Sequence, residues 1–185
     1  MTVAENPLYK DLVKQFGDAL HDAAFITEKP KQIISVSPKL DLALGGGVPE
    51  GSLFIMTGPE KIGKTVTALS FCANAQSQER FVYYGNIEGR LKKRDLEGIR
   101  ELQLGPEQFQ MVGSSEGNIL SGEDYLGIFD KVVHGHPKSV AVVDSFSALA
   151  AEAELAGELK DIQVMSIQKT QAKWCRRIGN VLPIN

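Results

Sequence analysis

"LFIMTGPEKIGKT", residues 53–65, joins an apolar run to a loop that contains glycine, lysine and threonine. The run at 53–57 is typical of a buried strand, and residues 58–65 fit the pattern glycine, any four residues, glycine, lysine, threonine. In a loop of this kind the backbone amides point inward at phosphate oxygens, and the N-terminus of the following helix adds positive potential. The context of strand, loop and helix therefore favours a phosphate loop over an ordinary turn into a helix.

The residue types in this loop suit a nucleotide polyphosphate. Glycine lets the backbone approach the phosphates closely, Lys64 would reach the β and γ phosphates, and the Thr65 hydroxyl would bind Mg²⁺. The Glu60 side chain is expected to point away from the phosphates. The predicted ATP-binding residues are Gly58, Pro59, Glu60, Lys61, Ile62, Gly63, Lys64, Thr65 and Val66.

Apolar runs and helical segments alternate along the chain after residue 52. We expect strands at 53–57, 80–87, 109–113 and 139–144, and helices at 64–78, 91–103 and 122–134. Near-continuous apolar strands that alternate with helices are typical of a parallel sheet covered on both faces, because the crossover helices bury both sides. The pattern predicts an α/β fold, a three-layer αβα sandwich with a mainly parallel sheet.

Two acidic residues end predicted strands, which is where ligands bind in a parallel α/β sheet. Asp144 ends "SVAVVD" and is the candidate to hold Mg²⁺ through water; the alternative is that it caps the next segment with Ser145. Glu88 ends "FVYYGNIE" and is the candidate to orient the attacking water in hydrolysis, with a solvated acid or a helix cap as the alternative. Glu88 and Lys64 form the predicted catalytic set. Thr65 and Asp144 form the predicted metal set.

Composition excludes several classes of protein. The 185 residues are 43% hydrophobic and 23% charged, which is typical of one ordinary α/β domain rather than a disordered or fibrous chain. The sequence contains no run of about 18 apolar residues, and its start does not fit a signal peptide, so we expect a cytoplasmic protein. The net charge of −3 gives no global attraction to nucleic acid, so a DNA contact would need a local basic surface.

The N-terminal segment is predicted to form a separate helical arm. Leu8, Leu12, Phe16 and Leu20 are spaced four apart within residues 5–21, which predicts the apolar stripe of an amphipathic helix. We expect two parts. The first is an arm with a linker at 1–32, and the second is the α/β core at 33–185.

Several stretches of the sequence resemble the bacterial RecA recombinase family. They are "ISVSPKLDLALGGGVPEGSL", "GPEKIGKT", "FVYYGNIE", "VAVVDSFSALAAEAELAGEL" and "VMSIQKTQAKWCRRIGN". The resemblance runs from about residue 33 to 185, and the arm is similar in placement to the family's N-terminal helix, which packs on a neighbouring protomer. The glycine-rich "LGGGVPEG" also occurs in the related RadA and KaiC ATPases, but the spacing of the later stretches favours RecA or its phage counterpart UvsX.

The resemblance implies a DNA-dependent ATPase that uses ATP and Mg²⁺, assembles into a helical filament or ring on single-stranded DNA, and promotes strand exchange in recombination and repair. Lys64, Thr65, Glu88 and Asp144 match the family's functional positions. Residues of about 151–165 would line the DNA. A basic stripe could face the DNA phosphates or a partner, although a solvated helix face is an equal alternative. The stripe consists of Lys169, Lys173, Arg176 and Arg177.

Two departures from the family pattern stand out. Where the family presents an aspartate and a tyrosine to the adenine, residues 89–98 read "GRLKKRDLEG" without an aromatic side chain, which leaves base selectivity open. The sequence ends at "VLPIN", before the family's central strand, so we expect a truncated core that is unstable alone or is completed by another chain. Two alternatives to a recombinase stay open. One is a non-catalytic nucleotide-binding and assembly module, and the other is a KaiC-like or RadA-like ATPase.

Overall fold

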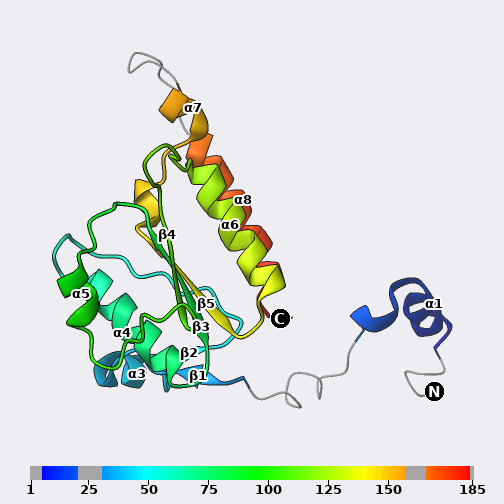
Figure 1. Cartoon of the computed structure of the whole chain (residues 1–185). Helices are drawn as coiled ribbons and strands as arrows, with labels where there is room; N and C mark the ends of the chain where they lie inside the picture. The colour runs from blue at the N-terminus through cyan, green and yellow to red at the C-terminus, as the bar shows by residue number, and fades with distance from the viewer. Residues whose placement is uncertain (1–5, 21–30, 157–165, 184–185) are drawn as a thin grey trace. The chain divides into compact units, whose positions relative to one another are not determined.

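A computed structural model describes residues 6–20, 31–156 and 166–183 (Figure 1). The contacts within the chain divide it into two compact units, Met1–Gln32 and Ile33–Asn185.

The first unit contains one amphipathic helix. Helix α1 spans Pro7–Phe16, and a 3-10 turn, η2, follows at Gly17–Ala19. The Asn6 side chain caps α1 by accepting a hydrogen bond from the backbone amide of Leu8 at 2.9 Å. No residue of α1 is buried, and the Leu8 side chain is 64% exposed. The helix predicted at 5–21 is therefore confirmed over its middle part, and its apolar stripe has no partner within the described part of this unit.

The second unit is built on a parallel sheet of three strands in the order β4-β3-β5. These strands are β3 (Phe81–Asn86), β4 (Phe109–Val112) and β5 (Ser139–Asp144). Three of the strands predicted from apolar runs are thus confirmed. In the β3/β5 ladder Asn86 lies opposite Asp144, so the carboxyl ends of these strands meet at one edge. A separate antiparallel pair joins β1 (Ile33–Ile34) to β2 (Val48–Pro49).

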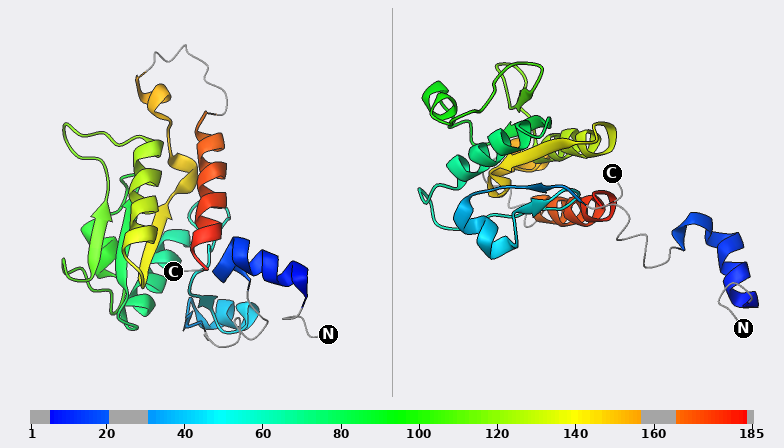
Figure 2. Two further views of the ribbon diagram at one scale, coloured as in Figure 1. Left: turned by 90° about the vertical axis from the view of Figure 1, so that its right-hand side faces the viewer. Right: turned by 90° about the horizontal axis from the view of Figure 1, so that it is seen from below.

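Helices cover both faces of the three-stranded sheet (Figure 1). On one face lie α4 (Lys64–Gln76) and the short α5 (Lys93–Glu97). On the other lie α6 (Gly122–Gly135) and α8 (Ser166–Val181), which run side by side (Figure 2). The predicted three-layer α/β fold is confirmed. Shorter elements are α3 (Pro38–Leu44), η3 (Phe146–Ala148) and α7 (Glu152–Ala156).

Each face of the sheet has its own hydrophobic cluster. The α4 cluster consists of Ala68, Leu69, Cys72, Val82, Tyr84 and Phe109. The α6 cluster consists of Val112, Tyr125, Leu126, Phe129, Leu149, Ala151 and Ile167. Alternate residues of β3 point to opposite faces, so Val82 and Tyr84 enter the α4 cluster while Tyr83 packs against the α6 cluster.

The strand predicted at 53–57 is wrong in this structure. Within the described residues no backbone hydrogen bond involves this segment, and β5 pairs only with β3. Ile55 is 66% exposed and Leu53 is 43% exposed, although Met56 packs against the α4 cluster. An apolar run of this kind becomes a strand only when a neighbouring strand satisfies its amides and carbonyls, and no described strand does so.

The helix predicted at 91–103 is much shorter than expected. It forms only over Lys93–Glu97, with Gly98 as its C-cap, and Glu101 adopts a positive φ of 65° in the turn that follows, a conformation that a right-handed helix does not contain. The helices predicted at 64–78 and 122–134 agree with α4 and α6 to within two residues.

Candidate nucleotide-binding site

The glycine-rich loop ends where helix α4 begins. Gly63 precedes the helix with a φ of +98°, a conformation that glycine adopts without a steric penalty, and Lys64 is the first helical residue. The Lys64 ammonium group donates hydrogen bonds to two carbonyls of its own loop, Gly58 O at 2.8 Å and Pro59 O at 2.7 Å. The Lys64 ammonium group therefore lies over the start of its own loop, near the N-terminus of α4, where the first backbone amides have no partner within the helix.

The first helical turn is joined to the end of β5. The Thr65 hydroxyl donates to Asp144 Oδ2 at 2.8 Å, so the two residues predicted as the metal set lie in contact. Tyr84 donates its phenolic hydroxyl to the same oxygen at 2.7 Å. Burial raises the pKa of Tyr84 far above its usual value, and the hydrogen bond to Asp144 adds to this shift. Tyr84 therefore remains a neutral hydrogen-bond donor.

These groups fit Mg²⁺ bound together with a nucleotide. Magnesium in phosphate-loop proteins takes a hydroxyl from the loop, phosphate oxygens and waters, one of which is held by an acid at the end of a neighbouring strand. Thr65 supplies the hydroxyl and Asp144 the carboxylate, within 2.8 Å of each other. The described residues contain no group of three or more histidine, cysteine or acidic side chains that could hold a metal ion without a nucleotide.

Glu88 lies two residues beyond the end of β3 and its carboxylate has two partners. The Ser145 hydroxyl donates to Glu88 Oε1 at 2.8 Å, and the Arg90 guanidinium lies 3.0 Å from Glu88 Oε2. The Glu88 side chain is 34% exposed, whereas that of Arg90 is 78% exposed. Because Ser145 directly follows Asp144, its hydrogen bond links Glu88 to the end of the strand that carries the other predicted acid.

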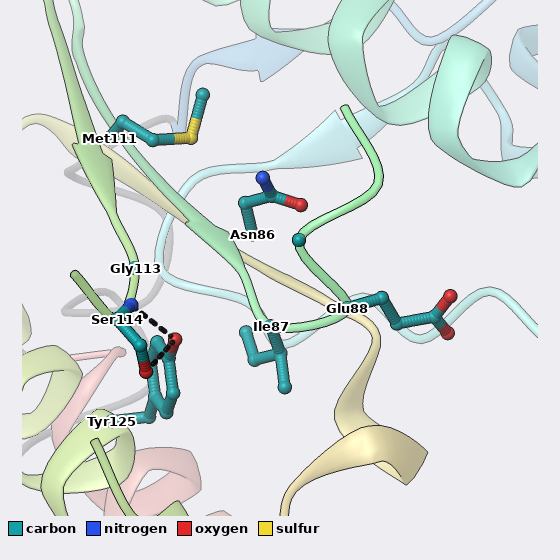
Figure 3. Close-up of a pocket in the computed structure, with 8 residues that line it drawn as sticks. Asn86, Ile87, Glu88, Met111, Gly113, Ser114 and Tyr125 are labelled. Atoms are coloured by element: carbon teal, nitrogen blue, oxygen red, sulfur yellow. Dashed lines mark hydrogen bonds between the residues drawn. The ribbon is translucent and has the colours of Figure 1, made fainter. Parts of the chain in front are cut away.

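A cavity of about 420 Å³ lies beside Glu88, at the carboxyl ends of β3 and β4 (Figure 3). Glu88 is one of the lining residues, and its side chain points away from Met111 and Tyr125 (Figure 3). Tyr125 accepts a hydrogen bond from the Ser114 amide at 3.0 Å, which fixes one wall. The sequence did not predict this cavity, because its lining combines the ends of two strands with a helix.

The residues expected to contact DNA are only partly described. Residues 152–156 form α7, and 157–165 lie outside the described residues. All four residues of the basic stripe, Lys169, Lys173, Arg176 and Arg177, are exposed on α8. Arg177 also pairs with Asp130 of α6 at 2.9 Å, so its charge is partly neutralised.

Sequence reasoning missed the two hydroxyls that hold the acids. Sequence patterns offer Ser145 only as the alternative capping partner of Asp144, and they give Tyr84 no role in the site. A signal for Tyr84 did exist, since a tyrosine inside a buried apolar strand needs a hydrogen-bond partner for its hydroxyl. That partner, Asp144, is 60 positions away in the chain.

The parallel sheet and the glycine-rich loop ahead of α4 define the class of α/β proteins with a phosphate-loop core. A family model for the RecA N-terminal domain matches residues 8–183. The chain therefore belongs to the RecA family.

Individual relatives agree with this assignment. The chain is 33% identical over 178 residues to the protein RecA of Rippkaea orientalis, covering 93% of this chain and 46% of that protein. It is 32% identical over 179 residues to the protein RecA of Synechocystis sp. (96% and 46%), and 34% identical over 174 residues to that of Bifidobacterium longum (91% and 41%). The chain spans slightly under half the length of these curated relatives. Across the described ranges, no helix is long and apolar enough to span a membrane.

Proposed function

We propose that this chain acts as an ATP-dependent DNA recombinase, a single-stranded-DNA-binding ATPase that promotes homologous pairing and strand exchange in recombination and repair. The observation that carries the proposal is the contact between Thr65 and Asp144, which joins a phosphate-loop hydroxyl to an acid at a strand end in a chain of the RecA family. The relatives named above support the recombinase class. A cytoplasmic location belongs to the same proposal.

The geometry of the site supports the following proposed roles. ATP would lie along residues 58–66. Lys64 would exchange its hydrogen bonds to the two loop carbonyls for hydrogen bonds to the β and γ phosphates. Thr65 would ligate Mg²⁺ directly and Asp144 through water. When bound, Mg²⁺ neutralises negative charge on the phosphates. Glu88, held by Ser145, would orient the attacking water.

The DNA and assembly surfaces are proposals of the same kind. Residues 151–165 would contact single-stranded DNA together with the basic stripe on α8, a helix with no acidic residue. The exposed apolar stripe of α1 would pack on a neighbouring protomer in a filament or ring.

Hydrolysis of ATP with and without single-stranded DNA tests this function. We expect DNA to stimulate hydrolysis, and Lys64→Ala to lose ATP binding by a factor of about 10 to 100, because hydrogen bonds to charged groups contribute about 1.5–3 kcal/mol. Lys131→Ala, a change on the exposed surface of α6, is the matched control and should retain activity. If the chain binds ATP and Mg²⁺ but single-stranded DNA does not stimulate its ATP hydrolysis, the proposed recombinase function is contradicted.

One observation favours a second candidate, a non-catalytic nucleotide-binding and assembly module. The segment 53–57, which leads into the loop, has no ladder partner among the described residues, so the loop is supported mainly from α4 and β5. Such a loop could bind a nucleotide without the rigidity that hydrolysis needs. Nucleotide binding without turnover, together with binding to a complete recombinase, would identify this second function.

A further inference from the structure

One oxygen of the Asp144 carboxylate accepts two hydrogen bonds. Thr65 donates to Oδ2 at 2.8 Å and Tyr84 donates to the same atom at 2.7 Å. The other oxygen, Oδ1, accepts no hydrogen bond from the residues that the structure describes. Since a carboxylate oxygen has two lone pairs, the two hydroxyls occupy Oδ2, and Oδ1 is the oxygen that can accept from a magnesium-bound water.

The two donors differ in how firmly they are held. Thr65 is half-buried in the first turn of α4, at the end of the loop that receives the nucleotide. Tyr84 lies in the middle of β3 and is completely buried. Its ring stacks on Phe109 with centroids 6.1 Å apart and an angle of 19° between the planes. The Tyr84 hydroxyl is therefore a fixed donor whose position does not depend on the loop.

We propose that Tyr84 is a positioning residue for magnesium, which fixes the orientation of the Asp144 carboxylate so that Oδ1 faces the ion. The inference rests on the proposed function, because it assumes that Thr65 and Asp144 serve a magnesium nucleotide. Without the phenolic hydroxyl the carboxylate can rotate about its terminal bond and loses a charge-assisted hydrogen bond. Partners that contact a metal ligand commonly change metal affinity by about 10- to 100-fold, and because Asp144 would reach the ion through water, we expect Tyr84 to act at the low end of this range.

Tyr84→Phe tests this role, because it removes the hydroxyl and keeps the ring. We expect the Mg²⁺ concentration for half-maximal ATP binding, measured by calorimetry, to rise by about tenfold. The affinity for ATP in the presence of EDTA should stay unchanged. A merely structural role would lower both affinities together or neither.

Tyr83→Phe is the matched control on the same strand. Its hydroxyl also has a hydrogen bond, to His136 Nδ1 at 2.9 Å, but on the opposite face of the sheet. Tyr83→Phe should leave the Mg²⁺ dependence at the wild-type value. An equal shift in both variants, or no shift in Tyr84→Phe, would overturn the inference.

A second measurement needs no Tyr84 variant, in case Tyr84→Phe does not fold. In full chain labelled with ¹³C at tyrosine Cζ, the Tyr84 signal should move in Asp144→Asn and stay in place in Glu88→Gln. An unmoved signal in Asp144→Asn would contradict the contact on which the inference depends. Failure of the wild-type chain to bind ATP with Mg²⁺ would instead reject the proposed function itself.

Discussion

Thr65 and Asp144 are 79 positions apart in the chain, and the Thr65 hydroxyl donates to Asp144 Oδ2 at 2.8 Å. The contact ties the start of α4 to the end of β5. A parallel sheet with its helices in place brings the first turn of a helix close to an acid at a strand end, because the carboxyl ends of the strands share one edge. The fold and the candidate site therefore depend on each other.

Asp144→Asn should separate metal binding from folding. Asparagine keeps the shape and can still accept from Thr65 and Tyr84, but it lacks the negative charge that attracts a magnesium-bound water. We expect Mg²⁺ to stop strengthening ATP binding, whereas the affinity for ATP in EDTA and the unfolding midpoint stay close to wild type. Calorimetry with and without Mg²⁺ measures this. A retained Mg²⁺ effect would mean that another group holds the ion.

Glu88→Gln should uncouple ATP binding from hydrolysis. The Ser145 hydroxyl can still donate to the amide oxygen, so the side chain stays in place, but the amide is a much poorer acceptor for the proton of the attacking water. We expect kcat to fall by about 10² to 10⁴-fold with little change in KM for ATP. Single-turnover hydrolysis measures the chemical step. Arg90→Ala is the control, since it removes only a 78% exposed partner of Glu88.

Much of the fold follows from local sequence patterns. The strands β3, β4 and β5 and the helices α4 and α6 were predicted because apolar runs and helical periodicity mark them directly. The run at 53–57 carries the same local signal and is not a strand, because pairing depends on neighbours that no local pattern contains. The helix predicted at 91–103 was too long for a different reason. The observed helix α5 has its C-cap at Gly98, and Glu101 then adopts a positive φ.

The candidate site, like the fold, was predicted only in part from the sequence. The loop at 58–65 and the acids Glu88 and Asp144 were predicted because each follows an apolar run, and the contact between Thr65 and Asp144 is consistent with that prediction. Tyr84 and Ser145 were not identified as partners of these acids. Their roles come from side-chain directions across the sheet edge, which the sequence does not specify.

Gly85→Ala should destabilise the core through overpacking. An added Cβ at this position of β3 would lie 2.8 Å from Phe129 Cζ and 2.9 Å from Ile87 Cδ1. We expect the free energy of unfolding to fall by about 1–3 kcal/mol in chemical denaturation. Gly127→Ala is the matched control, because its Cβ would meet nothing within 4 Å and the helix interior favours alanine. It should stabilise the chain by up to about 1 kcal/mol.

Asp41 should make stability depend on acidic pH. The Ser35 hydroxyl and the Val36 amide donate to its carboxylate, and these hydrogen bonds lower the pKa of Asp41 below its usual value. A lowered pKa in the folded state means that this stabilisation is complete above the unfolded pKa of about 3.9 and is lost as the pH falls through the folded pKa. Asp41→Asn should flatten the loss of stability below about pH 4, measured by thermal unfolding at several pH values. Glu107→Gln, on the exposed surface, should leave the pH profile unchanged.

The segment 53–57 should exchange its backbone amide protons much faster than β3. In the described part of the chain none of its amides donates a hydrogen bond, whereas β3 is paired on both sides by β4 and β5. Amides of a central strand exchange only through larger openings, so a difference of about 2.8 kcal/mol in opening free energy would give a hundredfold ratio of rates. Hydrogen exchange read by mass spectrometry on peptides covering 52–57 and 81–86 measures this ratio directly.

Addition of ATP and Mg²⁺ should protect the loop at 58–65 more than the 53–57 segment, because the nucleotide contacts the loop amides and supplies no ladder partner. Equal protection of 53–57 and β3 would mean that this run has a strand partner in solution, and the proposed non-catalytic function would then lose its support.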